Sequence, residues 1–120
     1  MNEFEILAPK PPSLNKFYGG KHWTYRKRMA DGYKMELKNT LAESVGDSVV
    51  RDWKSFKIYI SYNSRYDVDN SVLCSKFVAD ALVELGFVKD DSPTYYTKLT
   101  IKHDKELPKD TYLVKITYYV

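Results

Sequence analysis

Two short acidic segments contain the residues best suited to chemistry. Asp67-Val68-Asp69-Asn70 follows a run of alternating apolar residues, and Asp90-Asp91 follows a stretch with helical spacing. Clustered carboxylates repel one another unless a cation neutralises them. Mg²⁺ binds such oxygens together with water and substrate phosphate, and a bound metal can activate water and stabilise charge on an attacked phosphate. If the two segments meet at one end of a sheet, the four aspartates predict a phosphodiester-cutting site.

The alternative is that both segments are ordinary polar turns, since Asp and Asn are common in turns. Spacing alone favours this alternative. A calcium-binding EF-hand loop is excluded, because the positions that need glycine and a bidentate glutamate, counted from Asp67, hold Val72 and Val78.

Lys76 is the basic residue nearest to the first acidic segment on the expected helix. It lies seven residues after Asp69, which places it about 10 Å further along a helix axis on nearly the same side. Its long side chain could reach a phosphate held at the acidic site. The alternative is a surface ion pair with Asp80, four residues on, contributing a few tenths of a kcal/mol.

A basic and aromatic segment occupies residues 16–28 and predicts contact with nucleic acid. Lysine and arginine suit phosphates, and aromatic faces suit unstacked bases. Three cations fall where a helix is expected to begin, although the helix dipole disfavours cations there, and a DNA backbone would compensate. The equally supported alternative is a solvated loop whose aromatic rings fold onto the core. The candidate DNA-binding residues are Asn15, Lys16, Lys21, His22, Arg26, Lys27 and Arg28.

The pattern of apolar residues predicts six elements that position these segments. Strands are expected at residues 4–8, 56–62, 93–103 and 111–119, helices at 26–45 and 71–85, loops at 13–25 and 63–70, and a hairpin loop at 106–110. Gly86 suits the end of the second helix. The order β-α-β-α-β-β favours a single α+β domain over residues 1–120, with one mixed sheet covered by two helices.

Composition narrows the class of protein without identifying it. The 120 residues contain 43% hydrophobic residues, enough for one core, and a net charge of +3, too small to indicate nucleic-acid binding by itself. The single cysteine, Cys74, lies in an apolar helical stretch and is expected to be a packed thiol. The N-terminus lacks a signal-peptide pattern and no apolar run reaches membrane-spanning length, so we expect a cytoplasmic protein that does not bind membranes.

Taken together and in order, these motifs resemble the RusA-type Holliday junction resolvases, endonucleases of phages and prophages. The matching features are Pro11-Pro12-Ser13-Leu14-Asn15, Asp67-Val68-Asp69-Asn70, Lys76 through Asp80-Ala81-Leu82, Gly86 and Asp90-Asp91. The resemblance covers most of the chain. Each motif is weakly specific, whereas the ordered set is fairly specific.

The resemblance implies a RusA-like fold and a homodimer that binds four-way DNA junctions and nicks them in symmetric pairs using Mg²⁺, with Mn²⁺ as a substitute. It implies Asp67, Asp69 and Asp91 as metal ligands with Asp90 beside them, and a catalytic lysine on the following helix. That lysine usually comes three residues after the asparagine, where this chain has Leu73. Lys76 precedes the Asp-Ala-Leu motif at the family's interval, so we infer three inserted residues and take Lys76 as the candidate.

Two other functions stay open at this point. One is a metal-dependent nuclease with broader substrates, such as flaps or single strands. The other is a DNA-binding or assembly protein that keeps the fold without catalysis. The four acidic positions argue for catalysis, while the displaced lysine leaves the non-catalytic function open.

Overall fold

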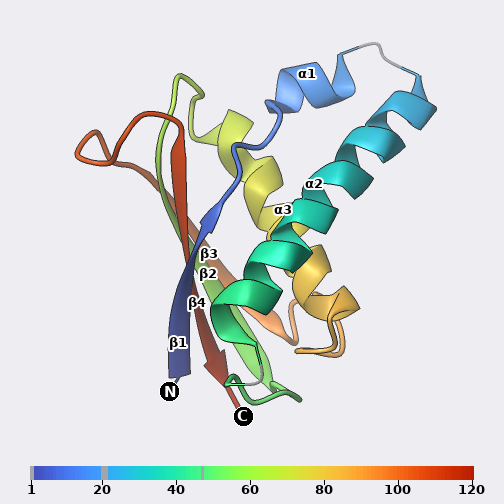
Figure 1. Ribbon diagram of the computed structural model, residues 1–120, viewed down its shortest axis with the longest axis vertical. Helices are drawn as coiled ribbons and strands as arrows, with labels where there is room; N and C mark the ends of the chain where they lie inside the picture. The colour runs from blue at the N-terminus through green and yellow to red at the C-terminus, as the bar shows by residue number, and fades with distance from the viewer. Residues whose placement is uncertain (1, 20–21, 47) are drawn as a thin grey trace.

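The computed structural model describes residues 2–19, 22–46 and 48–120, without the side chains at positions 14 and 15. Figure 1 shows a sheet with helices packed on one side of it. The strands are β1 (Asn2–Ala8), β2 (Ser55–Asn63), β3 (Tyr96–His103) and β4 (Thr111–Tyr119). The helices are α1 (Leu14–Tyr18), α2 (Trp23–Val45) and α3 (Val72–Glu84), with a 3₁₀ turn η1 (Asp69–Ser71) before α3.

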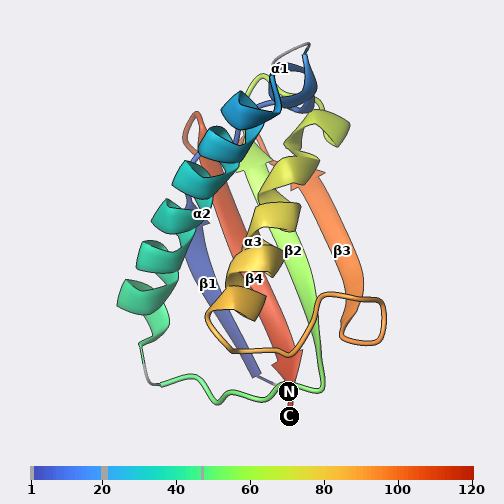
Figure 2. The same cartoon turned by 90° about the vertical axis from the view of Figure 1, so that its right-hand side faces the viewer.

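The four strands form one mixed sheet in the order β1-β4-β2-β3. Strand β4 is antiparallel to both of its neighbours, and β2 is parallel to β3. Helices α2 and α3 lie side by side across one face, and no helix of the described residues covers the opposite face (Figures 1 and 2). The expectation of an α+β domain with a mixed sheet covered by two helices is therefore confirmed. No helix in the described part of the chain is long and apolar enough to cross a membrane.

The core lies between the sheet and the two long helices. Alternate residues of β2 and β4 point into it, including Ile58, Ile60 and Ile116, and α2 contributes Leu37 and Leu41. All five are at most 1% exposed, and burying a side chain of this size contributes about 1.5–3 kcal/mol. Cys74 is also buried, as expected, and burial raises the pKa of its thiol to about 12.

The expected hairpin at residues 106–110 is wrong. Strand β4 pairs with the far side of β2 rather than with β3, so the connecting segment crosses the end of β2. It is held there by two hydrogen bonds: the Asp104 backbone N–H donates to the Tyr62 carbonyl at 2.8 Å, and Asn63 Nδ2 donates to the Leu107 carbonyl at 2.6 Å. The local sequence predicted the loop correctly, but it did not predict that β4 would pair with β2 instead of β3. The strand expected from residue 93 also begins three residues later, at Tyr96.

The expected loop at 13–25 is also partly wrong, because it contains α1 and the first turn of α2. Ser13 caps α1 by accepting a hydrogen bond from the Lys16 backbone N–H. His22 caps α2, since its Nδ1 accepts from the Thr24 backbone N–H at 3.2 Å. Histidine is not among the preferred capping residues, which is why the helix start was predicted too late.

Helix α3 ends in a Schellman motif at Gly86, as expected from the sequence. The Phe87 N–H donates to the Leu82 carbonyl and the Gly86 N–H to the Val83 carbonyl, both at 3.0 Å. Gly86 has a φ of +81°, a conformation that favours glycine. This turn sets the direction in which the chain leaves the helix toward Asp90 and Asp91.

We expect Gly86→Ala to lower the free energy of unfolding by about 1 kcal/mol, because alanine is strained at positive φ. Gly32→Ala is the matched control. Gly32 lies inside α2 with no atom within 4 Å of an added Cβ, so this change should raise the free energy of unfolding by up to about 1 kcal/mol. Urea denaturation of both variants measures the difference, and equal effects would contradict the Schellman assignment.

Candidate active site along the third helix

A polar cluster under the first acidic segment fixes its position above the sheet. The Tyr62 hydroxyl donates to the Tyr66 carbonyl at 2.9 Å. The Tyr112 hydroxyl is hydrogen-bonded to Ser64 Oγ at 2.9 Å and to Ser71 Oγ at 3.0 Å. Since Tyr62 and Tyr112 come from the two central strands and are fully buried, the segment between Ser64 and Ser71 is tied to the sheet at both ends.

Asp67 and Asp69 are exposed on this tied segment, at the end of α3 where the helix begins. The short helix α1 packs against η1 at the same end. The acidic segment therefore lies beside the basic and aromatic residues that precede α2, an arrangement that spacing along the chain could not predict.

Asp90 and Asp91 are exposed at the opposite end of α3, between the Gly86 turn and the start of β3. The expectation that all four aspartates converge is wrong. Strands β2 and β3 are neighbours, as that expectation required, but they are parallel. The loop that follows β2 and the loop that precedes β3 therefore lie at opposite ends of the sheet, with α3 running between them (Figure 2).

The metal site implied by the resemblance does not fit a single chain. The 13 residues of α3 span about 20 Å, and no three His, Cys, Asp or Glu side chains among the described residues are grouped closely enough to hold a metal ion. A Mg²⁺ ion shared by Asp67, Asp69 and Asp91 of one protomer is incompatible with this arrangement. No step of a reaction is therefore assigned to such an ion.

A different grouping occurs midway along α3, around Lys76, Asp80 and Asp91. Lys76 and Asp91 line a groove of about 380 Å³ between α3 and β3, and Asp80 and Asp91 line a neighbouring pocket of about 290 Å³ that also contains Lys34. Partial burial raises the pKa of the Asp80 carboxyl, and the charge of Asp91 adds to this rise, while Lys34 and Lys76 oppose it. The Asp80 carboxyl thus lies within the influence of two other carboxylates, Asp91 and Glu84, and of two ammonium groups, Lys34 and Lys76.

The groove also contains a buried tyrosine hydroxyl. Tyr96 lines it next to Ser75, and burial raises the pKa of the Tyr96 phenol to about 12. Ser75 Oγ itself donates to the Val72 carbonyl at 2.6 Å. Tyr96 Oη makes no hydrogen bond of good geometry within the described residues, although its interaction with Ser75 partly offsets the rise in its pKa.

Asp80 and Tyr96 were not among the site residues predicted from the sequence. A signal for Asp80 was present, because it lies four residues after Lys76 on one helix face. Lys76 takes part in none of the ion pairs found among the described residues, so the simple Lys76–Asp80 surface pair is not formed. Tyr96 had no local signal, since its place in the groove depends on which strand adjoins β2.

The basic and aromatic segment presents most of its rings to solvent. Tyr18, Trp23 and Tyr25 are 49%, 60% and 38% exposed, whereas Phe17 is buried against Phe77. Of these rings only Phe17 folds onto the core, so the alternative of a loop with all its rings packed inward is not what the structure shows. Exposed rings beside cations are the features that bases and phosphates would contact.

The predicted DNA-binding cations differ in their surroundings. Lys16 and Arg28 are exposed, Arg26 stacks over the Tyr18 ring at 5.6 Å, and Lys27 pairs with Asp31 at 3.1 Å. Because α2 begins at Trp23, Arg26 stands beyond the first turn, where the helix dipole has little effect. The helix dipole therefore gives little reason to expect a compensating anion at Arg26. His22 is engaged as the α2 cap, and Lys21 and the Asn15 side chain lie outside the described residues.

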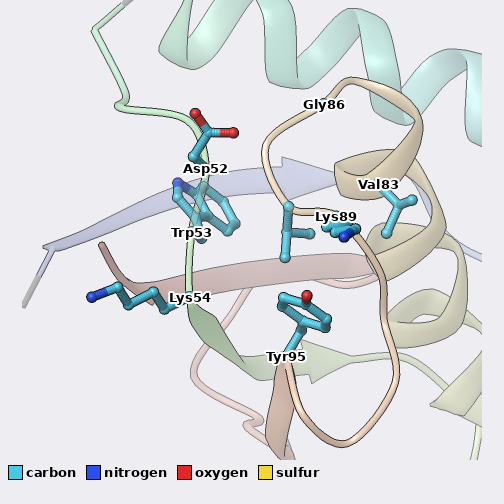
Figure 3. Close-up of a pocket in the computed structure, with 8 residues that line it drawn as sticks. Asp52, Trp53, Lys54, Val83, Gly86, Lys89 and Tyr95 are labelled. Carbon is cyan, nitrogen blue, oxygen red and sulfur yellow. The ribbon is translucent and has the colours of Figure 1, made fainter.

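A larger pocket of about 530 Å³ lies near the end of α3 at Gly86, between that helix and the segment that precedes β2 (Figure 3). Its inner wall includes Trp53, whose ring stacks on Tyr118 at 4.5 Å and on Phe87 at 5.3 Å. The Lys54 side chain extends away from the other lining residues (Figure 3). This pocket lies at the edge of the hydrophobic core, and none of the predicted site residues lines it.

No protein-family model matches the chain, and no curated protein matches its sequence. Its function must therefore be argued from its own residues and geometry.

The Asp80 carboxyl provides a direct test of the site's electrostatics. We expect Asp91→Asn to lower the pKa of Asp80, because a neighbouring negative charge is removed, and Lys76→Gln to raise it, because a positive charge is removed. Carboxyl ¹³C NMR titration measures both shifts. Shifts of the same sign, or none, would mean that these groups do not face one site.

The same raised pKa has a defined effect on stability. A carboxyl whose folded-state pKa lies above its unfolded-state value favours the folded state most at low pH, and this contribution falls as the pH rises from the ordinary aspartate range through the raised pKa. We expect Asp80→Asn to remove that part of the pH dependence. Urea denaturation at several pH values, with exposed Asp31→Asn as control, measures it, and identical profiles for wild type and Asp80→Asn would contradict the assignment.

Proposed function

We propose that this protein is an endonuclease for branched DNA that resolves four-way junctions by paired nicks. The observation that carries the proposal is the grouping of Lys76, Asp80 and Asp91 around the α3–β3 groove. The ordered motifs that resemble RusA-type resolvases support it, since Lys76, Asp80 and Asp91 all fall within those motifs. The exposed rings and cations before and within α2 support DNA as the substrate.

The chemistry that these side chains can supply is hydrolysis of a phosphodiester. Water attacks phosphorus, the bond to the leaving oxygen breaks, and a base takes the proton of the water. Asp80 suits the role of base, because its raised pKa brings it closer to neutral pH. The Lys76 ammonium can stabilise the negative charge that develops on the phosphate or on the leaving oxygen.

Asp67 and Asp69 lie at the end of α3 beside the basic and aromatic segment, away from the proposed reacting carboxylates. A requirement for Mg²⁺ or Mn²⁺ is part of the proposal through the resemblance, although the three-aspartate site it implies does not fit one protomer. A homodimer is likewise proposed on the resemblance alone, and sedimentation equilibrium should then give twice the chain mass of 14.0 kDa.

A DNA-binding protein without catalysis is the second candidate function. The separation of Asp67 and Asp69 from Asp91 favours it, because the implied metal ligands do not meet within the chain. Under this function the protein binds four-way junctions without cutting them when Mg²⁺ or Mn²⁺ is supplied.

We expect Lys76→Ala to lower single-turnover cleavage of a saturating four-way junction by about a hundredfold, as for the loss of a transition-state charge contact. Junction affinity should change far less. Lys105→Ala, in an exposed turn away from the groove, is the control and should cut normally. Cleavage by wild type that survives unchanged in Lys76→Ala would remove this lysine from the site.

A panel of asparagine variants then locates the reacting carboxylates. Under the proposal Asp80→Asn and Asp91→Asn abolish cleavage while binding persists, because the size of each side chain is kept and its charge is lost. Asp69→Asn tests the metal role implied by the resemblance, and cleavage by this variant at the wild-type rate in Mg²⁺ would reject that role. Absence of cleavage by wild type in either metal, with junction binding intact, would establish the second function instead.

Replacing Arg26, Lys27 and Arg28 together by alanine should weaken junction binding and flatten its salt dependence. Each lost phosphate contact lowers the slope of log K against log salt by about 0.9. Fluorescence anisotropy at several salt concentrations measures the slope. An unchanged slope would mean that this segment does not touch phosphate.

A further inference from the structure

The face of the sheet opposite the helices has a composition unlike a purely solvated surface. Its central strands carry Tyr59 on β2 and Tyr119 at the end of β4. Their neighbours in sequence, such as Ile58 and Tyr118, point into the core, so alternation along each strand directs Tyr59 and Tyr119 outward. Tyr59 is 36% exposed although it lies on an inner strand.

Lysines surround both rings on this face. Lys115 Nζ lies 5.4 Å from the centre of the Tyr59 ring, and Lys57 Nζ lies 5.6 Å from the centre of the Tyr119 ring. These two contacts place the lysines and the tyrosines on one face of the sheet. The register adds Lys102, because Ser61 pairs with Lys102 on the neighbouring strand β3. Lys98, which pairs with Lys57, lies at the sheet edge and also lines the α3–β3 groove.

Charge varies across the face from one edge to the other. Glu3 and Glu5 lie on β1, in register with Thr117 and Lys115 of β4, and are the acidic residues among the outward positions of the four strands. The lysines concentrate toward β2 and β3. An anionic chain lying on this face would therefore follow the β2–β3 side, with both rings within its reach.

We propose that this open sheet face, defined by Tyr59, Tyr119, Lys57, Lys102 and Lys115, binds single-stranded DNA. Aromatic side chains on which bases stack, set among cations that contact the backbone, are the features by which proteins hold single strands without reading sequence. Tyr119 is in register with Ser55, four residues before Tyr59 on the adjacent strand. The two rings are thus about 13 Å apart along the strand direction, a span that a short extended segment of DNA covers.

Each tyrosine ring, together with the lysine beside it, can bind one nucleotide. A base that stacks on Tyr59 or Tyr119 displaces the ammonium from the ring face, and the flexible lysine then remains beside the nucleotide's phosphate. The choice of DNA over RNA rests on the proposed nuclease function. The proposal that this surface stacks bases is independent of that function. A single-strand site on the opposite side of the sheet from the α3–β3 groove would hold an unpaired arm of a branched substrate.

The test is binding of a fluorescent oligothymidylate of about 15 nucleotides, a length within the site sizes of known single-strand-binding folds. A chelator is present throughout, so the result does not depend on cleavage. We expect Tyr59→Leu and Tyr119→Leu each to weaken binding about tenfold, and Tyr59→Phe to bind like wild type because the ring is kept. Lys102→Gln should lower the salt slope by about 0.7.

Three results would overturn the proposal: unchanged affinity in both leucine variants, loss of affinity in the triple alanine variant at Arg26, Lys27 and Arg28 instead, or tighter binding of oligouridylate than of oligothymidylate. A change in oligomeric state in Tyr59→Leu would show that a second copy of the chain covers the face and would also overturn it. Amide chemical shifts of wild type on adding the oligonucleotide give a second measurement that needs no variant, with changes expected in β2 and β4. Junction cleavage is scored separately, so failure of the nuclease proposal and failure of this one are distinguishable.

Discussion

The parallel pairing of β2 with β3 is the constraint on which the rest of the structure depends. Two parallel neighbouring strands need a connection that runs back along the full length of the strands, and α3 provides it. The return separates the segment after β2 from the segment before β3 by the length of the helix. As a result α3 has one acidic pair at each end and a groove with mixed charges beside its middle.

The same pairing explains why the candidate site lies along α3 rather than at the end of the sheet. Helix α3 packs into the core through its buried residues, among them Leu73, Val78 and Leu82. Its more exposed positions then carry Lys76 and Asp80 toward the groove. The Gly86 turn brings Asp91 back alongside Asp80, which is the reason that the charge of Asp91, 11 positions along the chain, helps to raise the pKa of Asp80.

The molecule has two exposed surfaces that combine aromatic rings with cations. One end has exposed rings and cations around the start of α2, and the open sheet face has tyrosines and lysines in register on neighbouring strands. Helices α2 and α3 lie on one side of the sheet only (Figure 1), which leaves the second surface uncovered. Under the proposed function, two such surfaces would suit a branched substrate, because its arms diverge in space.

The sequence by itself determined the four strands and the two long helices, though not α1. Strand alternation, helical spacing, the glycine at the end of α3 and the buried Cys74 are all local patterns that burial and backbone geometry impose. It also named Lys76 and Asp91 as candidate site residues, while Asp80 entered only as a surface ion-pair partner of Lys76. Only the tertiary structure decided that residues 106–110 cross over β2, that the four aspartates separate and that Tyr96 enters the groove. The physical reason is that a strand's pattern records which of its faces is buried, whereas its partner and direction depend on contacts between residues far apart in the chain.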